Sequence, residues 1–220
     1  MEIVIITAAA AAGYLSGSVS YATIITRLVR GTEIRVLGSG NPGALNVGAA
    51  IGRRWGLVVG LLDGLKSFLP MLAAGMLLGS GKGRFADIAV MTAGLSAVVG
   101  HWKPIFHGFK GGQCIGTAVG VFLYIVPLEF FVSFITGGVF VFLVLKKRVG
   151  KWVRWVPIFF ILLIPPAAIL GGRQAHRSAG VILICGLLLF INRFYIRDRI
   201  RELQASKTSN PGNRPSRETG

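Results

Sequence analysis

Long apolar stretches, separated by short segments rich in glycine, arginine and lysine, fill most of this chain as far as about residue 193. Within each stretch the apolar residues are continuous rather than alternating, which favours helices over the strands of a barrel. A bilayer-spanning helix needs about 20 mostly apolar residues, because lipid offers no water to the backbone. We therefore predict an all-α polytopic membrane protein, a bundle of about seven short transmembrane helices over residues 3–27, 55–79, 86–102, 114–127, 130–146, 154–171 and 178–193.

The stretch from Ile115 to Leu145 is the ambiguous one. As a single helix its roughly 31 residues would extend for about 46 Å, which is too long for one ordinary span. Pro127 and Glu129 supply a helix breaker and a charge near its centre. The pattern favours two short helices joined as a hairpin.

The basic residues give the orientation. With seven spans, 19 lysines and arginines fall on one side of the membrane, within residues 27–54, 103–110, 146–154 and 193–217. The other side receives four: Lys82, Arg84, Arg173 and Arg177. Because basic residues concentrate in cytoplasmic loops, we expect the N-terminus outside and the C-terminus in the cytoplasm. Merging the two middle helices would move the 146–154 cluster to the other side and spoil this asymmetry.

Composition supports a membrane protein and argues against other classes. The chain has 220 residues, a mean hydropathy of +0.67 and 15% charged residues, where a soluble domain has about 25%. The formal charge of +16 does not indicate nucleic-acid binding, because the aromatic residues lie inside the apolar runs. The first segment has no basic start and its apolar run continues past Ala12, as in a transmembrane helix rather than a removable signal. Cys114 and Cys185 have no metal-ligand or disulfide spacing, so we expect small packing residues and no metal site.

We divide the chain into a transmembrane domain, residues 1–202, and a polar tail, residues 203–220. The tail is rich in turn-forming residues and has nothing apolar to bury, so we expect it to be disordered in the cytoplasm.

The segment Gly38–Asn46 is the first candidate for chemistry. Its glycines allow tight turns that bring backbone N–H groups close to a ligand, and its short polar side chains add donors, an arrangement that suits a phosphate. The glycines and short polar residues of this segment are Gly38, Ser39, Gly40, Asn41, Gly43 and Asn46. A flexible turn between helices is the alternative, and no strand precedes it as in a nucleotide-binding loop.

The segment from Gly100 to Thr117 is the second candidate. Lys110 and the pair Gly111 and Gly112 stand just before a predicted helix, whose N-terminus also favours an anion. The two histidines of this segment are more typical of interfacial positions than of a metal pair. In the second predicted helix Asp63 and Lys66, at i and i+3, can neutralise each other. We favour a structural role for that pair and keep a functional one open.

Both segments resemble motifs of the bacterial acyltransferases that use acyl phosphate and glycerol 3-phosphate, the PlsY family. The first motif, GSGNxGAxN, stands here as Gly38 to Asn46. The second, H-x-x-P-x-F-x-x-F-K-G-G-K-G-x-A-T, is matched by His101, Pro104, Phe106, Phe109, Lys110, Gly111, Gly112 and Thr117. Gly17 and Ser18 near the end of the first helix, and Asp63 with Lys66, also match in the family's order. The resemblance covers roughly residues 13–120, and the last two helices only by hydropathy.

The resemblance implies a seven-helix bundle with a cytosolic active site in the bacterial inner membrane. It implies transfer of an acyl chain from acyl phosphate to glycerol 3-phosphate without a metal or cofactor, so the protein mainly positions substrates and stabilises charge. Ser39 and His101 would be the catalytic residues. Phosphate or the reacting hydroxyl would be held by Gly38, Gly40, Asn41, Gly43, Asn46, Lys110, Gly111, Gly112, Thr117 and Asn192.

The chain departs from the family pattern at several charged positions. Ala49 stands where the family has arginine, Gln113 where it has lysine, and Cys114 where it has glycine. In the tail, Leu189 and Tyr195 replace a histidine and an arginine around Asn192. Charge-assisted hydrogen bonds are worth about 1.5–3 kcal/mol each, so weak activity is expected.

Two other functions compete with the enzyme. One is a non-catalytic membrane scaffold or lipid-binding subunit that keeps the loops, and the other is a small transporter. A transporter would need a pathway of intramembrane charges, for which only Asp63, Lys66 and Glu129 are available. We favour the enzyme, because four arginines lie near the first segment and one of them can replace the cation missing at Ala49: Arg30, Arg35, Arg53 and Arg54.

Overall fold

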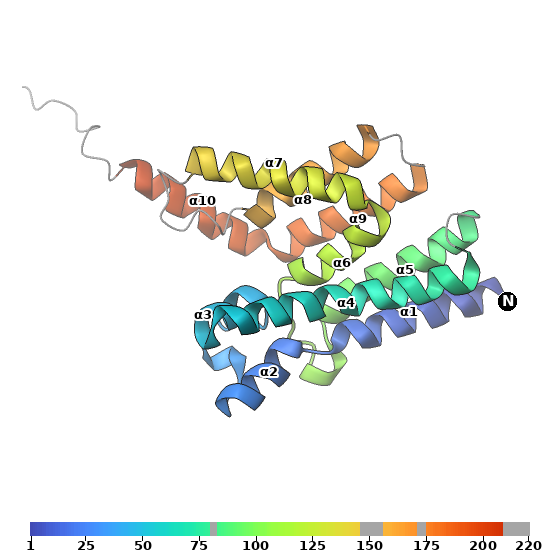
Figure 1. The fold of residues 1–220 in the computed structure, drawn as a ribbon, viewed down its shortest axis with the longest axis horizontal. Helices are drawn as coiled ribbons and strands as arrows, with labels where there is room; N and C mark the ends of the chain where they lie inside the picture. The colour runs from blue at the N-terminus through green and yellow to red at the C-terminus, as the bar shows by residue number, and fades with distance from the viewer. Residues whose placement is uncertain (80–82, 146–155, 171–174, 209–220) are drawn as a thin grey trace, which may run out of the picture.

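The computed structural model describes residues 1–79, 83–145, 156–170 and 175–208, and this part of the chain is helical without any strand (Figure 1). Each of the predicted segments after the first contains one helix, with ends within a few residues of those expected. The predicted all-α class is therefore confirmed. The basic cluster at 146–154, Lys82, Arg173 and the end of the tail, 209–220, lie outside the described residues.

The first predicted span, 3–27, is wrong as a single helix. Helix α1 (Glu2–Ser18) ends before Val19, whose backbone is extended, and α2 (Tyr21–Arg30) starts after it. Ser20 caps α2, its hydroxyl accepting a hydrogen bond from the Thr23 N–H at 3.4 Å. The break leaves the Val19 carbonyl outside any helix, where it accepts a hydrogen bond from Lys66 at 3.0 Å.

Helices α3 (Ala44–Ile51), α4 (Arg53–Leu78), α5 (Arg84–Trp102) and α6 (Ile115–Ile125) complete the first group around α1. Short 3₁₀ helices η1 (Ile34–Val36) and η2 (Ile105–His107) lie in the connections. Glycines allow α1 and α5 to touch backbone to backbone: a Cβ on Gly13 or Gly17 would lie 2.1 Å from the carbonyl oxygen of Ala93 or Ala97. Small residues four apart are the usual means of close helix packing in membranes.

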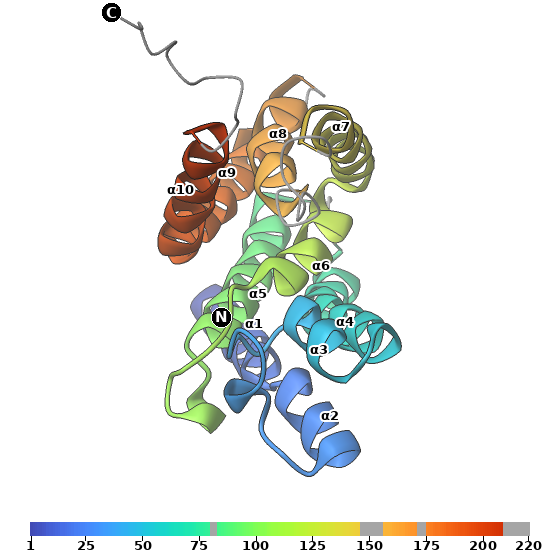
Figure 2. The same ribbon diagram turned by 90° about the vertical axis from the view of Figure 1, so that its left-hand side faces the viewer.

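Helices α7 (Pro127–Leu145), α8 (Val156–Leu170) and α9 (Ala175–Ile191) form a second group beside the first (Figure 2). The chain breaks between α6 and α7 at Val126, next to the predicted break at 127–129, and Pro127 takes the first position of α7. Buried apolar residues of α4 to α9, including Phe122 and Ile164, join the two groups in one core.

The predicted start of the polar tail, residue 203, lies within the last helix of the described chain. Helix α10 (Arg193–Thr208) extends past residue 202. The sequence from Arg201 to Lys207 is rich in residues of high helix propensity, such as arginine, glutamate, leucine and alanine, which favours continuation of the helix.

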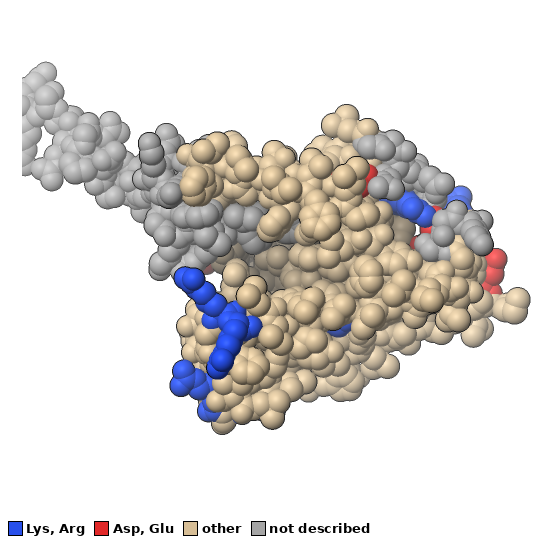
Figure 3. All heavy atoms as spheres, in the orientation of Figure 1, with Lys and Arg blue, Asp and Glu red and all other residues tan. Residues whose placement is uncertain are grey.

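Length and composition of the helices fit a membrane. Three helical segments of the described chain are long and apolar enough to cross a bilayer: Glu2–Arg30, Arg53–Leu78 and Arg84–His107. Four shorter apolar helices accompany them. Mostly uncharged surface covers the middle of the visible face, lysines and arginines gather at the end occupied by α2 and α3, and a smaller group of charged residues of both signs lies at the other end (Figure 3). The start of α1 and helix α10 lie at opposite ends of the long axis (Figure 1).

Candidate functional site

The two glycine-rich segments lie at the same end of the molecule, near α2 and α3 (Figure 1). We name them the first loop, residues 37–43 between η1 and α3, and the second loop, residues 103–114 between α5 and α6. Arg35 joins them, because its guanidinium donates a hydrogen bond to the backbone carbonyl of Lys110.

Asn46 shapes the first loop from the first turn of α3. Its Oδ1 accepts a hydrogen bond from the Ser39 N–H at 2.9 Å, and its Nδ2 donates to the carbonyls of Leu37 at 3.0 Å and Asn41 at 3.1 Å. Gly38 and Gly40 have φ angles of 54° and 71°, which only glycine adopts readily. Asn46 is 5% exposed and its amide holds the first loop, while its role as a substrate ligand stays a prediction.

Glycines allow the second loop to fold back onto the end of α5. A Cβ on Gly111 would lie 2.0 Å from the His101 carbonyl oxygen and 2.2 Å from that of Trp102. The Gly112 N–H donates to the His101 carbonyl at 3.1 Å. A Cβ on Gly112 would lie 2.5 Å from Nε2 of His101 and 3.4 Å from Oδ1 of Asn41. The imidazole edge of His101 therefore meets both loops at this glycine.

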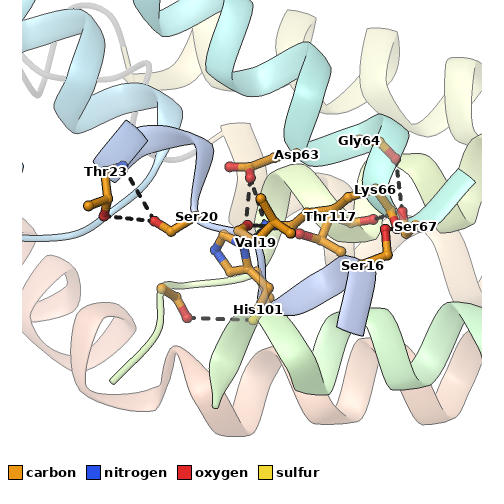
Figure 4. A network of polar contacts seen from close by, with 12 residues as sticks. Ser16, Val19, Ser20, Thr23, Asp63, Gly64, Lys66, Ser67, His101 and Thr117 are labelled. Carbon is orange, nitrogen blue, oxygen red and sulfur yellow. Dashed lines mark hydrogen bonds and ion pairs between the residues drawn. The ribbon is translucent and has the colours of Figure 1, made fainter. Parts of the chain in front are cut away.

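Behind His101 lies a buried polar network built on α4 (Figure 4). The Lys66 ammonium donates to Asp63 Oδ1 at 2.8 Å, to the Val19 carbonyl at 3.0 Å and to Nδ1 of His101. The same Asp63 oxygen lies 3.7 Å from Nδ1 of His101. The side chains of Lys66 and Asp63 are 0% and 4% exposed. Asp63 and Lys66 pair as predicted, and the structure connects that pair to a predicted catalytic residue.

Two open pockets flank His101. The Arg35 pocket has about 180 Å³ of empty space and is lined by Gly17, Ser18, Val19, Ser20, Arg35, Pro42, His101, Pro104, Gly111 and Gly112. The Gln113 pocket has about 660 Å³ and is lined by Asn41, Gly43, Ala44, Leu45, Asp63, His101, Gln113, Cys114, Ile115 and Gly116. The glycine pair and the first loop thus contribute to both pockets.

Some predicted site residues come together at these pockets and some do not. Asn41, Gly43, His101, Gly111 and Gly112 line them. Gly38 and Ser39 are exposed at the loop surface, and the Ser39 hydroxyl accepts from the Asn41 N–H at 3.5 Å.

Lys110 and Thr117 line neither of these two pockets, and their role in binding stays a prediction. Lys110 is exposed, and its carbonyl accepts a hydrogen bond from Arg35. Thr117 is 0% exposed at the contact with α4, where its carbonyl accepts from the Ser67 hydroxyl at 2.6 Å.

Asn192 lies beneath the second loop, at the junction of α9 and α10. Its Nδ2 donates to the Gln113 carbonyl at 3.0 Å and to the Leu188 carbonyl at 2.8 Å, and the residue is 3% exposed. The structure therefore assigns Asn192 a contact with the loop backbone behind the Gln113 pocket.

Sequence reasoning did not include Arg35, Ser18 or Gln113 among the site residues. Arg35 is named there only as one of several arginines that can replace a missing cation, and its position three residues before Gly38 is the signal that favours it over the others. For Ser18 the only signal in the sequence is the short Gly-Ser match to the family, at Gly17 and Ser18. Gln113 differs from the lysine of the family pattern, and its position within the second motif is the signal that it faces the site.

Comparison with known proteins gives concordant results. A family model described as Glycerol-3-phosphate acyltransferase matches residues 7–205. Proteins of that name from Anaeromyxobacter sp. (strain Fw109-5) and Aquifex aeolicus (strain VF5) are 41% identical over 129 residues and 42% over 123 residues. These matches cover 59% and 56% of this chain, and 63% and 60% of the relatives, less than two thirds of their length.

Two solved structures share the fold over nearly the whole chain. Both are crystal structures of PlsY (YgiH), an integral membrane glycerol 3-phosphate acyltransferase. Its glycerol 3-phosphate form has a TM-score of 0.74 and 30% identity, and the match covers 92% of this chain and 93% of that one. Its lysophosphatidic acid form has a TM-score of 0.74 and 29% identity, over 90% and 93%.

Proposed function

This chain is an integral membrane protein that belongs to the glycerol-3-phosphate acyltransferase family, and we propose that it transfers an acyl chain from acyl phosphate to glycerol 3-phosphate. In this reaction the hydroxyl oxygen of glycerol 3-phosphate bonds to the acyl carbon, and the bond from that carbon to the phosphate oxygen breaks. The proton lost by the hydroxyl leaves with the released phosphate. The products are lysophosphatidic acid and inorganic phosphate, so the reaction belongs to phospholipid synthesis.

The observation that carries the proposal is the position of His101 between two pockets of different chemistry. The Arg35 pocket contains a guanidinium, two serines and the glycine pair, which are donors for a phosphate. The Gln113 pocket is larger and includes Leu45 and Ile115. We assign the phosphate of glycerol 3-phosphate to the Arg35 pocket and the acyl phosphate to the Gln113 pocket. The two reacting groups then meet at His101.

Arg35 is the cation that we assign to this role. Its side chain is 25% exposed and lies 3.8 Å from Glu33, so its charge is only partly screened. The hydrogen bond to the Lys110 carbonyl fixes one edge of the guanidinium, and other N–H groups stay available for a phosphate. Arg35 would thus compensate for the charge absent at Ala49 and Gln113.

Purified full-length protein, supplied with acyl phosphate and glycerol 3-phosphate and followed by phosphate release, tests the proposal. Arg35→Gln should raise the KM for glycerol 3-phosphate about tenfold or more, the effect of losing one charge-assisted hydrogen bond. Arg27→Gln is the matched control, because Arg27 also pairs with Glu33, at 3.7 Å, but lines neither pocket. Equal effects of the two variants would contradict the assignment of Arg35.

The second candidate function is a non-catalytic membrane scaffold. The observation that favours it is the absence of the family's cations at Ala49 and Gln113. A scaffold predicts neither phosphate release nor saturable binding of either substrate by the purified protein. Measurable turnover by the wild type, at any rate, that falls in the Arg35→Gln variant would exclude the scaffold.

For the orientation, we propose a multi-pass protein of the bacterial inner membrane with both loops in the cytoplasm. Single cysteines at Val36 and Phe106, which are 74% and 60% exposed, should be labelled only from the cytoplasmic side. The background lacks Cys114 and Cys185. A cysteine at Gly83, before α5 at the other end, is the control and should be labelled only from outside. Labelling of Val36 from outside would contradict this topology.

A further inference from the structure

The Lys66 ammonium can form only one kind of hydrogen bond with His101, as the donor. An ammonium group carries three N–H donors and no lone pair. Two of the Lys66 donors reach oxygens, those of Asp63 and Val19, and the third reaches Nδ1 of His101. In this contact Nδ1 can only accept.

An imidazole whose Nδ1 accepts a hydrogen bond has its proton on Nε2. A ring protonated at Nδ1 would point an N–H at the Lys66 ammonium, because the Asp63 oxygen, 3.7 Å from Nδ1, lies beyond hydrogen-bond distance. The α4 network therefore selects one tautomer of His101 before any substrate is bound. Lys66, 0% exposed, is closed off from water and holds this choice.

The Nε2 edge of His101 faces the opposite way, toward the site. It lies at Gly112, where a Cβ would come within 2.5 Å of the ring nitrogen, and both pockets open beside it. The absence of a side chain at Gly112 leaves this N–H uncovered. A donor held in this way, with its direction already fixed, can stabilise an oxygen on which charge develops.

We propose that Lys66 is a positioning residue that fixes His101 as a hydrogen-bond donor, so that its Nε2–H stabilises an oxygen of the acyl phosphate. His101 in this form has no lone pair toward the substrates, and it does not abstract the proton of the attacking hydroxyl. The inference rests on the proposed acyl transfer for its substrate, and on the geometry of α4 and α5 for the state of the ring.

The state of the ring can be measured without turnover. The chain has three histidines, His101, His107 and His176, so ¹⁵N-histidine labelling of the full-length protein gives few signals. His101→Gln identifies the signal of His101. We expect a proton on Nε2 and a bare Nδ1 in the wild type. The pair Asp63→Ala with Lys66→Met removes both buried charges together and should give a mixture of the two tautomers. A wild-type ring protonated at Nδ1, or an unchanged ring in the double variant, would overturn the role of Lys66.

Turnover separates a donor from a base at His101. The glutamine side chain places an N–H near the position of Nε2 and cannot act as a base, whereas alanine does neither. We expect His101→Ala to lower kcat about 100-fold, the usual effect of losing one such donor, and His101→Gln to retain at least about a tenth of the wild-type kcat. His107→Gln is the matched control and should leave kcat unchanged, because His107 lines neither pocket.

The outcomes distinguish this inference from the proposed function. Turnover that His101→Gln abolishes as fully as His101→Ala would overturn the donor and leave the acyltransferase in place. A ring protonated at Nε2 in a protein with no turnover would overturn the acyltransferase and the acyl-phosphate contact, and would support the role of Lys66.

Discussion

The loop before α3 and the loop before α6 contain similar residues, but the fold holds them by opposite means. A side chain organises the first loop, since Asn46 bonds to three of its backbone groups. The second loop is organised by the lack of side chains, because Gly111 and Gly112 let its backbone contact the end of α5. A substitution can thus remove a bond from the first loop, whereas in the second loop it adds an atom where none fits.

Gly111→Ala should have the largest effect. Its Cβ would lie 2.0 Å and 2.2 Å from two carbonyl oxygens of α5, which are backbone atoms and cannot turn away. The loop must move, and misplacement by about 1 Å can cost about 100-fold in turnover. Phosphate release and thermal stability in detergent measure this. Gly83→Ala is the control, because nothing lies within 4 Å of its Cβ, and it should match the wild type. Full activity of Gly111→Ala would contradict the backbone contact.

Asn46→Ala comes next. It leaves the Ser39 N–H without a partner and removes one of the two hydrogen bonds that the Leu37 and Asn41 carbonyls each accept. Each lost bond is worth about 0.5–1.5 kcal/mol. We expect turnover to fall between tenfold and 100-fold. Asn46→Asp should be no better than alanine, because it restores the acceptor for Ser39 but turns a carboxylate toward the Leu37 and Asn41 carbonyls. Val36→Ala, at a site 74% exposed beside the loop, is the control. An active aspartate variant would show that the two carbonyl contacts are not needed.

Restoring the missing cations should raise activity. Ala49 is exposed on α3 and Gln113 lines the larger pocket, so Ala49→Arg with Gln113→Lys adds two charges near a substrate phosphate. We expect turnover to increase by at least about tenfold, which is about 1.4 kcal/mol. Val36→Arg adds a charge at the same end outside both pockets and should leave the rate unchanged. A wild type as active as the double variant would mean that Arg35 already supplies the charge.

The smallest effect concerns Cys114, which has a φ of 65° at the N-cap of α6. A left-handed residue other than glycine costs about 1 kcal/mol or slightly more. Cys114→Gly should therefore be about 1 kcal/mol more stable than Cys114→Ala, since both lose the buried sulfur and only alanine keeps the strain. Denaturation in detergent compares them directly. An alanine variant of equal stability would show that the backbone relaxes.

The sequence by itself determined the class of fold, the positions of the helices from 55 onward and the two loops that form the site. These features depend on local properties: continuous apolar runs, a proline within a long run, and glycine-rich segments next to polar residues. A charge pattern was enough to place both loops at one end of the molecule.

Only the tertiary structure decided what each polar side chain does. Ser20, next to Val19 in the chain, caps the helix that follows the break. The Val19 carbonyl freed by the break is bonded by Lys66, which is 47 residues away in the chain. Helix packing places the Asn46 amide against the backbone of the first loop, and it places Arg35 at the carbonyl of Lys110. The connection of Asp63 and Lys66 to His101 requires α4 and α5 to pack side by side. A sequence motif shows which donors and acceptors are available, but their partners are set by helix packing, because a buried polar group bonds to whatever the fold brings within about 3 Å.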